Sequence, residues 1–166
     1  EAQIRSEASA NANRGNDASL TDEQRTAASA LASAQRTALR DGERFKAKSY
    51  AAVGQDSKSN DCHLRAGQLD IQLGDLTALE VDLATLQTPA HEAAAETLRA
   101  QATDDVLVAL EHCENADSIF ATVSDAELSP VVGELKDAHA SLYLDTQRRY
   151  VVGKFAAKEL ETRDEL

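Results

Sequence analysis

The sequence predicts an all-α fold, arranged as an antiparallel up-down-up-down four-helix bundle with one disulfide. Apolar residues recur at steps of three and four, which places them on one face of a helix. The clearest stripe is Leu69, Leu73, Leu76, Leu79 and Leu83. The chain has only 7 Gly and 2 Pro, too few for the many turns of an all-β protein. Short polar connections between the helical segments favour the bundle.

The N-terminal residues 1–19 are small and polar, with Asn, Gly and Asp residues that break helices. They are predicted to form a flexible segment or a short helix. Residues 20–166 are predicted to form a single helical-bundle domain, as this length suits one domain.

A first long helix is predicted to begin after Thr21 and to end near Gly54. Thr21 and Gln24 have the spacing of a capping box, in which each side chain binds the other residue's backbone. The letters of Leu20–Gln24, LTDEQ, also resemble the LTxxQ motif of Spy/CpxP-like periplasmic stress chaperones. That resemblance implies a helical protein that holds unfolded clients.

Two helices over 64–87 and 88–121 are predicted to form a hairpin that turns at Thr88, an N-cap, and Pro89, a first helical residue. Cys62 and Cys113 are equally far from this turn, and both lie on apolar stripes. Close packing of alanine-rich helices allows the Cα separation that a disulfide needs, so a Cys62–Cys113 bond is predicted. The alternative is two buried free thiols.

A last helix is predicted to begin with Ser129 as its cap and Pro130 as its first residue, and to run to near the C-terminus. The four final residues, Arg163–Leu166, resemble the KDEL-type signal for retention in the endoplasmic reticulum. A charged helix end has the same letters.

The net charge of −12, from 29 acidic and 17 basic residues, argues against nucleic-acid binding and adsorption to anionic membranes. No apolar run approaches the roughly 20 residues of a membrane span. An even pair of cysteines is typical of an oxidising compartment, and the chain lacks methionine, as a mature or excised segment would. We therefore expect an extracytoplasmic location: periplasmic, secreted or cell-surface.

No pattern of a catalytic nucleophile or phosphate loop occurs, and neither an enzyme nor a cofactor is predicted. A zinc site is a weaker alternative to the disulfide. Its ligands would be Cys62, His63, His112 and Cys113. Neighbouring helical residues point about 100° apart, so facing cysteines would direct the histidines outward. A run of carboxylates is interpreted as a solvent-exposed acidic face: Asp70, Asp75, Glu80 and Asp82.

Aromatic and basic residues gather in two stretches, which are interpreted as one binding patch. Its members are Arg44, Phe45, Tyr50, Tyr143, Arg148, Arg149, Tyr150 and Lys154. Arg and Tyr are enriched at interaction hot spots, so a protein partner or a small anionic ligand is predicted, and a homodimer is among the partners considered. Alternatively, the aromatics fill the bundle end and the cations only solvate the helices.

These observations predict a non-enzymatic, extracytoplasmic helical module that binds a protein partner or presents a surface. One alternative is a periplasmic ligand-sensing domain of a membrane receptor, similar to the four-helix sensory modules of bacterial chemoreceptors. Another is a periplasmic chaperone-like or metal-binding bundle.

Overall fold

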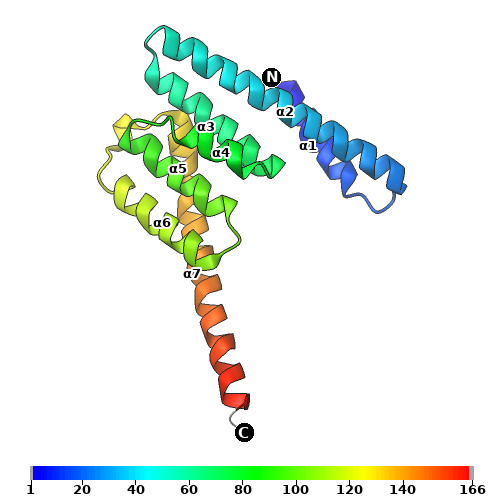
Figure 1. Cartoon of the computed structure of the whole chain (residues 1–166), viewed down its shortest axis with the longest axis vertical. Coiled ribbons are helices and arrows are strands. Elements are labelled where there is room, and N and C mark those ends of the chain that lie inside the picture. Colours follow the sequence, from blue (N-terminus) through cyan, green and yellow to red (C-terminus); the bar gives the residue numbers. More distant parts are fainter. Residues whose placement is uncertain (1, 165–166) are drawn as a thin grey trace. The chain divides into compact units, whose positions relative to one another are not determined.

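The computed structural model of the chain is helical, and it describes the backbone of residues 2–164 and the side chains of residues 2–156. Within the described backbone there are seven α-helices, one short 3₁₀ helix and no strand (Figure 1). The all-α prediction is therefore confirmed. The chain divides into two compact units, unit 1 (Glu1–Thr85) and unit 2 (Leu86–Leu166). The prediction of one domain over 20–166 stays a prediction.

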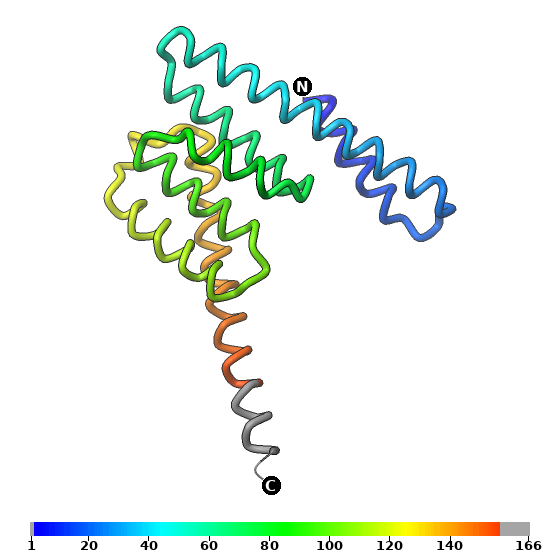
Figure 2. Tube along the Cα trace, in the orientation of Figure 1, coloured from blue at the N-terminus to red at the C-terminus, as the bar shows by residue number. Residues whose placement is uncertain are grey.

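Unit 1 is a series of helices in which each packs on the next. Its helices are α1 (Ala2–Gly15), α2 (Asp22–Ala52), α3 (Asp56–Leu73) and α4 (Leu76–Leu83). Contacts join α1 to α2, α2 to α3, and α3 to α4 (Figures 1 and 2). The predicted capping box starts α2: Thr21 Oγ1 accepts from the Gln24 amide at 3.3 Å, and Gln24 Oε1 accepts from the Thr21 amide at 3.0 Å.

The helix predicted over 64–87 is divided in two by Gly74 and Asp75. Gly74 ends α3 with φ +71°, a left-handed conformation that glycine adopts without steric cost. Asp75 then caps α4, because its Oδ1 accepts from the Ala78 amide at 3.1 Å. The leucine stripe is also interrupted: Leu79 is 1% exposed, whereas Leu76 is 49% exposed.

Unit 2 contains three packed α-helices, each contacting the other two. They are α5 (Pro89–Ala102), α6 (Val106–Phe120) and α7 (Pro130–Asp164), with the 3₁₀ helix η1 (Asp125–Glu127) before α7. The predicted start of α5 is confirmed: Thr88 is the N-cap and Pro89 the first helical residue. The helix predicted over 88–121 breaks at Thr103, which is extended, and Asp105 caps α6 through the amides of Leu107 and Val108.

The core of unit 2 combines small residues with a few large apolar ones. Ala93, Ala94, Leu98, Cys113, Ala116 and Val132 are fully buried in it. His139 is also buried, and neither of its ring nitrogens has a hydrogen-bond partner in the described residues. Its ring centroid lies 5.8 Å from that of Phe120 and 5.7 Å from that of Tyr143. Burial lowers the pKa of His139, although the Asp117 carboxylate, 3.9 Å from Nε2, opposes this.

The predicted four-helix bundle with a Cys62–Cys113 disulfide is wrong. Cys62 lies in α3 of unit 1 and Cys113 in α6 of unit 2, and both are free thiols. The predicted register counted residues along two unbroken helices from Pro89. The breaks at Gly74 and Thr103 remove that register. The alternative of two buried free thiols agrees with the structure.

Both thiols are held in the protonated form by their surroundings. Burial, and then the neighbouring Glu43 carboxylate, raise the pKa of Cys62 to about 11. Burial also raises the pKa of Cys113. Thiolate is the reactive form, so neither side chain is a ready nucleophile.

We predict that truncating Leu79 destabilises the protein far more than truncating Leu76 on the same helix. Leu79→Ala removes fully buried methyl groups and should cost about 2–5 kcal/mol of unfolding free energy. Leu76→Ala removes half-exposed ones and should cost less than about 1 kcal/mol. Urea denaturation followed by circular dichroism measures both, and equal losses would contradict the burial described here.

We also predict that both thiols react slowly with a disulfide-exchange reagent in the native protein and quickly in urea. Cys62→Ser and Cys113→Ser assign each reaction to its residue. Rapid labelling of either native thiol would contradict the burial. Absence of labelling in urea without reductant would instead reveal a disulfide.

Candidate functional site

The residues of the predicted binding patch come from two helices in different units. Arg44, Phe45 and Tyr50 lie on α2 of unit 1. Tyr143, Arg148, Arg149, Tyr150 and Lys154 lie on α7 of unit 2. The prediction that the two groups form one surface stays a prediction.

The α2 residues of the patch have three different environments. Phe45 is exposed, with 73% of its surface accessible. Tyr50 is half-buried, and the Lys58 ammonium lies 5.6 Å from its ring centroid. Arg44 is bound by carboxylates, as described below. Phe45 is therefore the α2 residue of the patch with the largest free apolar surface.

α7 continues beyond α5 and α6 (Figures 1 and 2), and Arg148, Arg149, Tyr150 and Lys154 follow the buried Thr146, whereas Tyr143 precedes it and stacks on His139. Thr146 is buried, and no residue from Gln147 to Ala156 is buried. We call residues 144–155 the α7 contact segment. Its exposed large apolar side chains are Leu144, Val151, Val152 and Phe155. Leu144, Val151 and Phe155 are separated by seven and four residues, so they lie on one stripe.

The α7 contact segment also carries three cations. Arg148, Arg149 and Lys154 form no ion pair within the described residues, and Asp145 is the only carboxylate of the segment. The Lys154 ammonium lies 5.3 Å from the Tyr150 ring centroid. This short stretch is basic, whereas the whole chain has a net charge of −12.

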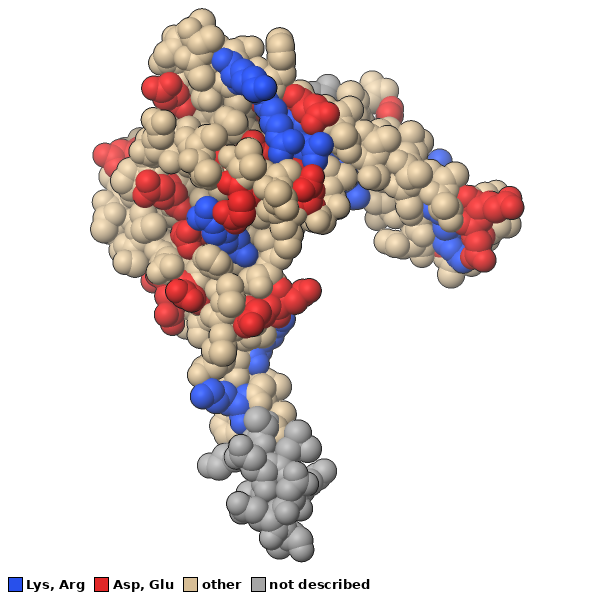
Figure 3. Space-filling model, viewed as in Figure 1, with Lys and Arg blue, Asp and Glu red and all other residues tan. Residues whose placement is uncertain are grey.

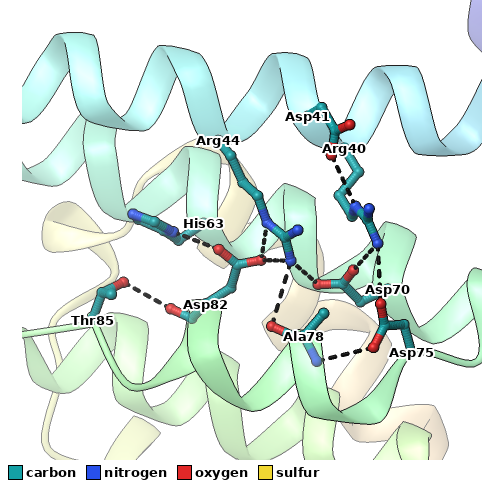
Figure 4. Close-up of polar contacts among 9 residues, drawn as sticks. All are labelled: Arg40, Asp41, Arg44, His63, Asp70, Asp75, Ala78, Asp82 and Thr85. Carbon is teal, nitrogen blue, oxygen red and sulfur yellow. Dashed lines mark hydrogen bonds and ion pairs between the residues drawn. The ribbon is translucent and has the colours of Figure 1, made fainter.

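Unit 1 contains a buried network of charges that the sequence did not reveal (Figure 4). Arg44 Nη2 lies 2.9 Å from Asp70 Oδ2 and 2.6 Å from Asp82 Oδ2. Arg40 Nη1 lies 3.2 Å from both Asp70 Oδ1 and Asp75 Oδ2. Asp70 and Asp82 are 0% and 2% exposed, so the predicted solvent-exposed acidic face is wrong for these two residues.

The two buried carboxylates differ in protonation. Burial raises the pKa of Asp70 to about 6, although the charge of Arg44 opposes this. Burial also disfavours ionisation of Asp82, but hydrogen bonds from His63 and Arg44 outweigh it and lower the pKa of Asp82. Asp82 is therefore the permanent anion, and Asp70 is the first to take up a proton. The contribution of Asp70 to stability is complete below about pH 4 and is lost as the pH rises through about 6.

The residues of the alternative zinc site bind other partners. His63 Nδ1 lies 2.8 Å from Asp82 Oδ1 in unit 1, and His112 Nδ1 lies 2.7 Å from Glu96 Oε2 in unit 2. In the part of the chain with described side chains, no group of three His, Cys, Asp or Glu residues could hold a metal ion.

The surface charge and the helices bear on the predicted partners. Figure 3 shows a run of Lys and Arg side chains over α2 and α3, bordered by acidic side chains. Among the described residues, none of the helices has an apolar stretch that could cross a membrane.

Comparisons of the chain with protein families, curated proteins and solved structures found no match.

We predict that the buried network stabilises unit 1 through Asp82. Asp82→Asn removes the anion shared by Arg44 and His63, leaves Asp70 as the remaining carboxylate of the partly buried Arg44, and should cost about 3 kcal/mol. Asp41→Asn is the matched control, because Asp41 is an exposed partner of Arg40 and its loss should cost less than about 1 kcal/mol. Hydrogen exchange of the α2–α4 amides measures both. Equal protection in the two variants would contradict a role of Asp82 in stability.

Proposed function

We propose that this protein is a non-enzymatic binding module that recognises a partner protein through the α7 contact segment. The observation that carries the proposal is the coincidence, on one stretch of helix, of an exposed apolar stripe and cations that form no ion pair with any residue whose side chain the structure describes. Leu144, Val151 and Phe155 are 58%, 48% and 70% exposed. Contiguous apolar surface of this kind, rimmed by polar residues, is typical of interaction sites.

The geometry of the segment favours a helical partner. A stripe with steps of seven and four residues matches the narrow seam along which two helices pack. An amphipathic helix that covers the stripe would bury Leu144, Val151 and Phe155 together. Burial of each such side chain contributes about 1.5–3 kcal/mol before the costs of association.

The charge of the segment favours an acidic partner. Arg148, Arg149 and Lys154 flank the stripe, with Asp145 as the only acidic residue among them. A second copy of the chain would bring like cations together, so it fits the segment less well than an acidic helix does. The chain as a whole carries a net charge of −12, which disfavours binding of such a helix over most of the remaining surface.

We predict that a synthetic amphipathic helix with glutamates beside its leucine seam binds the protein, and that a lysine version of the same peptide binds much more weakly. Phe155→Asp should weaken binding of the acidic peptide by about tenfold or more, because it places a like charge in the apolar seam. Arg148→Glu with Arg149→Glu should favour the lysine peptide. Fluorescence anisotropy measures all of these affinities.

The matched control for Phe155→Asp is Phe45→Asp. Phe45 on α2 is exposed to nearly the same degree, 73% against 70%, but it lies outside the α7 contact segment. Its substitution should leave the affinity unchanged. Equal binding of the two peptides, or equal losses in the two variants, would refute the proposed function.

A further inference from the structure

Three cations follow one another at four-residue spacing on α2: Arg40, Arg44 and Lys48. Like charges at this spacing repel each other on a helix unless anions lie between them. Arg40 and Arg44 have such anions in Asp70, Asp75 and Asp82. Lys48 is exposed and has no carboxylate partner within the described residues. The third cation of the row therefore lacks the anion that the first two have.

A pocket of about 470 Å³ opens beside this third cation, entirely within unit 1. It is lined by Arg44, Lys48, His63, Ala78, Val81, Asp82 and Thr85. Asp82 is 2% exposed, and its oxygens already accept from His63 and Arg44. The basic side chains and the exposed Thr85 therefore supply the accessible polar groups of the pocket.

The buried network orients two of these basic side chains. His63 directs Nδ1 toward Asp82, and its second ring nitrogen points away from that carboxylate (Figure 4). Arg44 uses Nε and Nη2 for Asp82 and Asp70, and its Nη1 makes no hydrogen bond in the described chain. The guanidinium of Arg44 is thereby held at one edge of the pocket, and a fixed cation attracts an anion at a lower entropic cost than a free side chain does.

The opposite wall of the pocket is formed by α4 and is partly apolar. Ala78 and Val81 line it, and Val81 is 64% exposed. The volume lies within the range of sites for small organic molecules. An inorganic ion would leave Val81 uncovered, whereas an anion with a short apolar tail would cover it.

We propose that this pocket binds a small amphipathic anion, a carboxylate or phosphate monoester with a short apolar tail. The anionic group contacts Lys48 on the α2 wall that Lys48 shares with Arg44, and the tail lies on Val81. This site is independent of the α7 contact segment, because every residue that forms it belongs to unit 1.

The test is a titration of the whole protein with hexanoate, hexyl phosphate and hexanol, followed by calorimetry and by the amide resonances of α2 and α4. Saturable binding is expected for at least one of the two anions, and the tighter one identifies the preferred head group. Hexanol has the same tail without the charge and should bind at least about tenfold more weakly.

Variants of two exposed lysines separate a pocket from general attraction to cations. Lys48→Ala should weaken anion binding about tenfold, since it removes one charge-assisted hydrogen bond, and Lys48→Arg should retain most of the affinity. Lys58→Ala is the matched control, because Lys58 lies over Tyr50 and does not line the pocket. Equal affinities of Lys48→Ala and Lys58→Ala, equal binding of hexanol and the anions, or absence of saturable binding would each overturn the proposal.

Discussion

The ion pair of Arg44 with Asp82, beside the second buried carboxylate Asp70, is the interaction on which unit 1 depends. A buried carboxylate is tolerated only when a cation and hydrogen bonds compensate for its lost hydration. Asp70 comes from α3 and Asp82 from α4, so one guanidinium joins α2 to two other helices. This matters most for α4, since a helix of 8 residues is not stable by itself in water. The Asp82 carboxylate also orients His63, through the contact with its Nδ1.

The basic residues of the two units have different environments. In α2, Arg40 and Arg44 are neutralised by buried carboxylates and hold helices together. In α7, Arg148 and Arg149 have no ion pairs among the described residues and lie beside exposed apolar side chains. The binding patch predicted from the sequence thus combined a structural arginine with candidate contact residues. Composition cannot separate these roles, because they depend on which side chains lie beside each arginine in the folded protein.

The sequence predicted those features that depend on neighbouring residues. The start of α2 at Thr21 and the start of α5 at Thr88 were correct, because capping involves residues only three positions apart. The break at Gly74 was missed, since the leucine spacing continues across it. The disulfide and the burial of Asp70 depend on distant parts of the chain, which periodicity does not report. Because the predicted disulfide is wrong, the main argument for an extracytoplasmic location is also removed. The four residues that resemble a retention signal, Arg163–Leu166, extend past the described residues.

The contrast between the two cores has a consequence for the response of the protein to temperature. The core of unit 2 is mainly alanine, leucine and valine, and hydrophobic stabilisation weakens on cooling. Unit 1 relies in addition on buried ions, whose dehydration penalty decreases on heating. Cold should therefore loosen unit 2 first, while warmth should favour the charged contacts of unit 1. A single melting temperature would then describe neither half of the chain well.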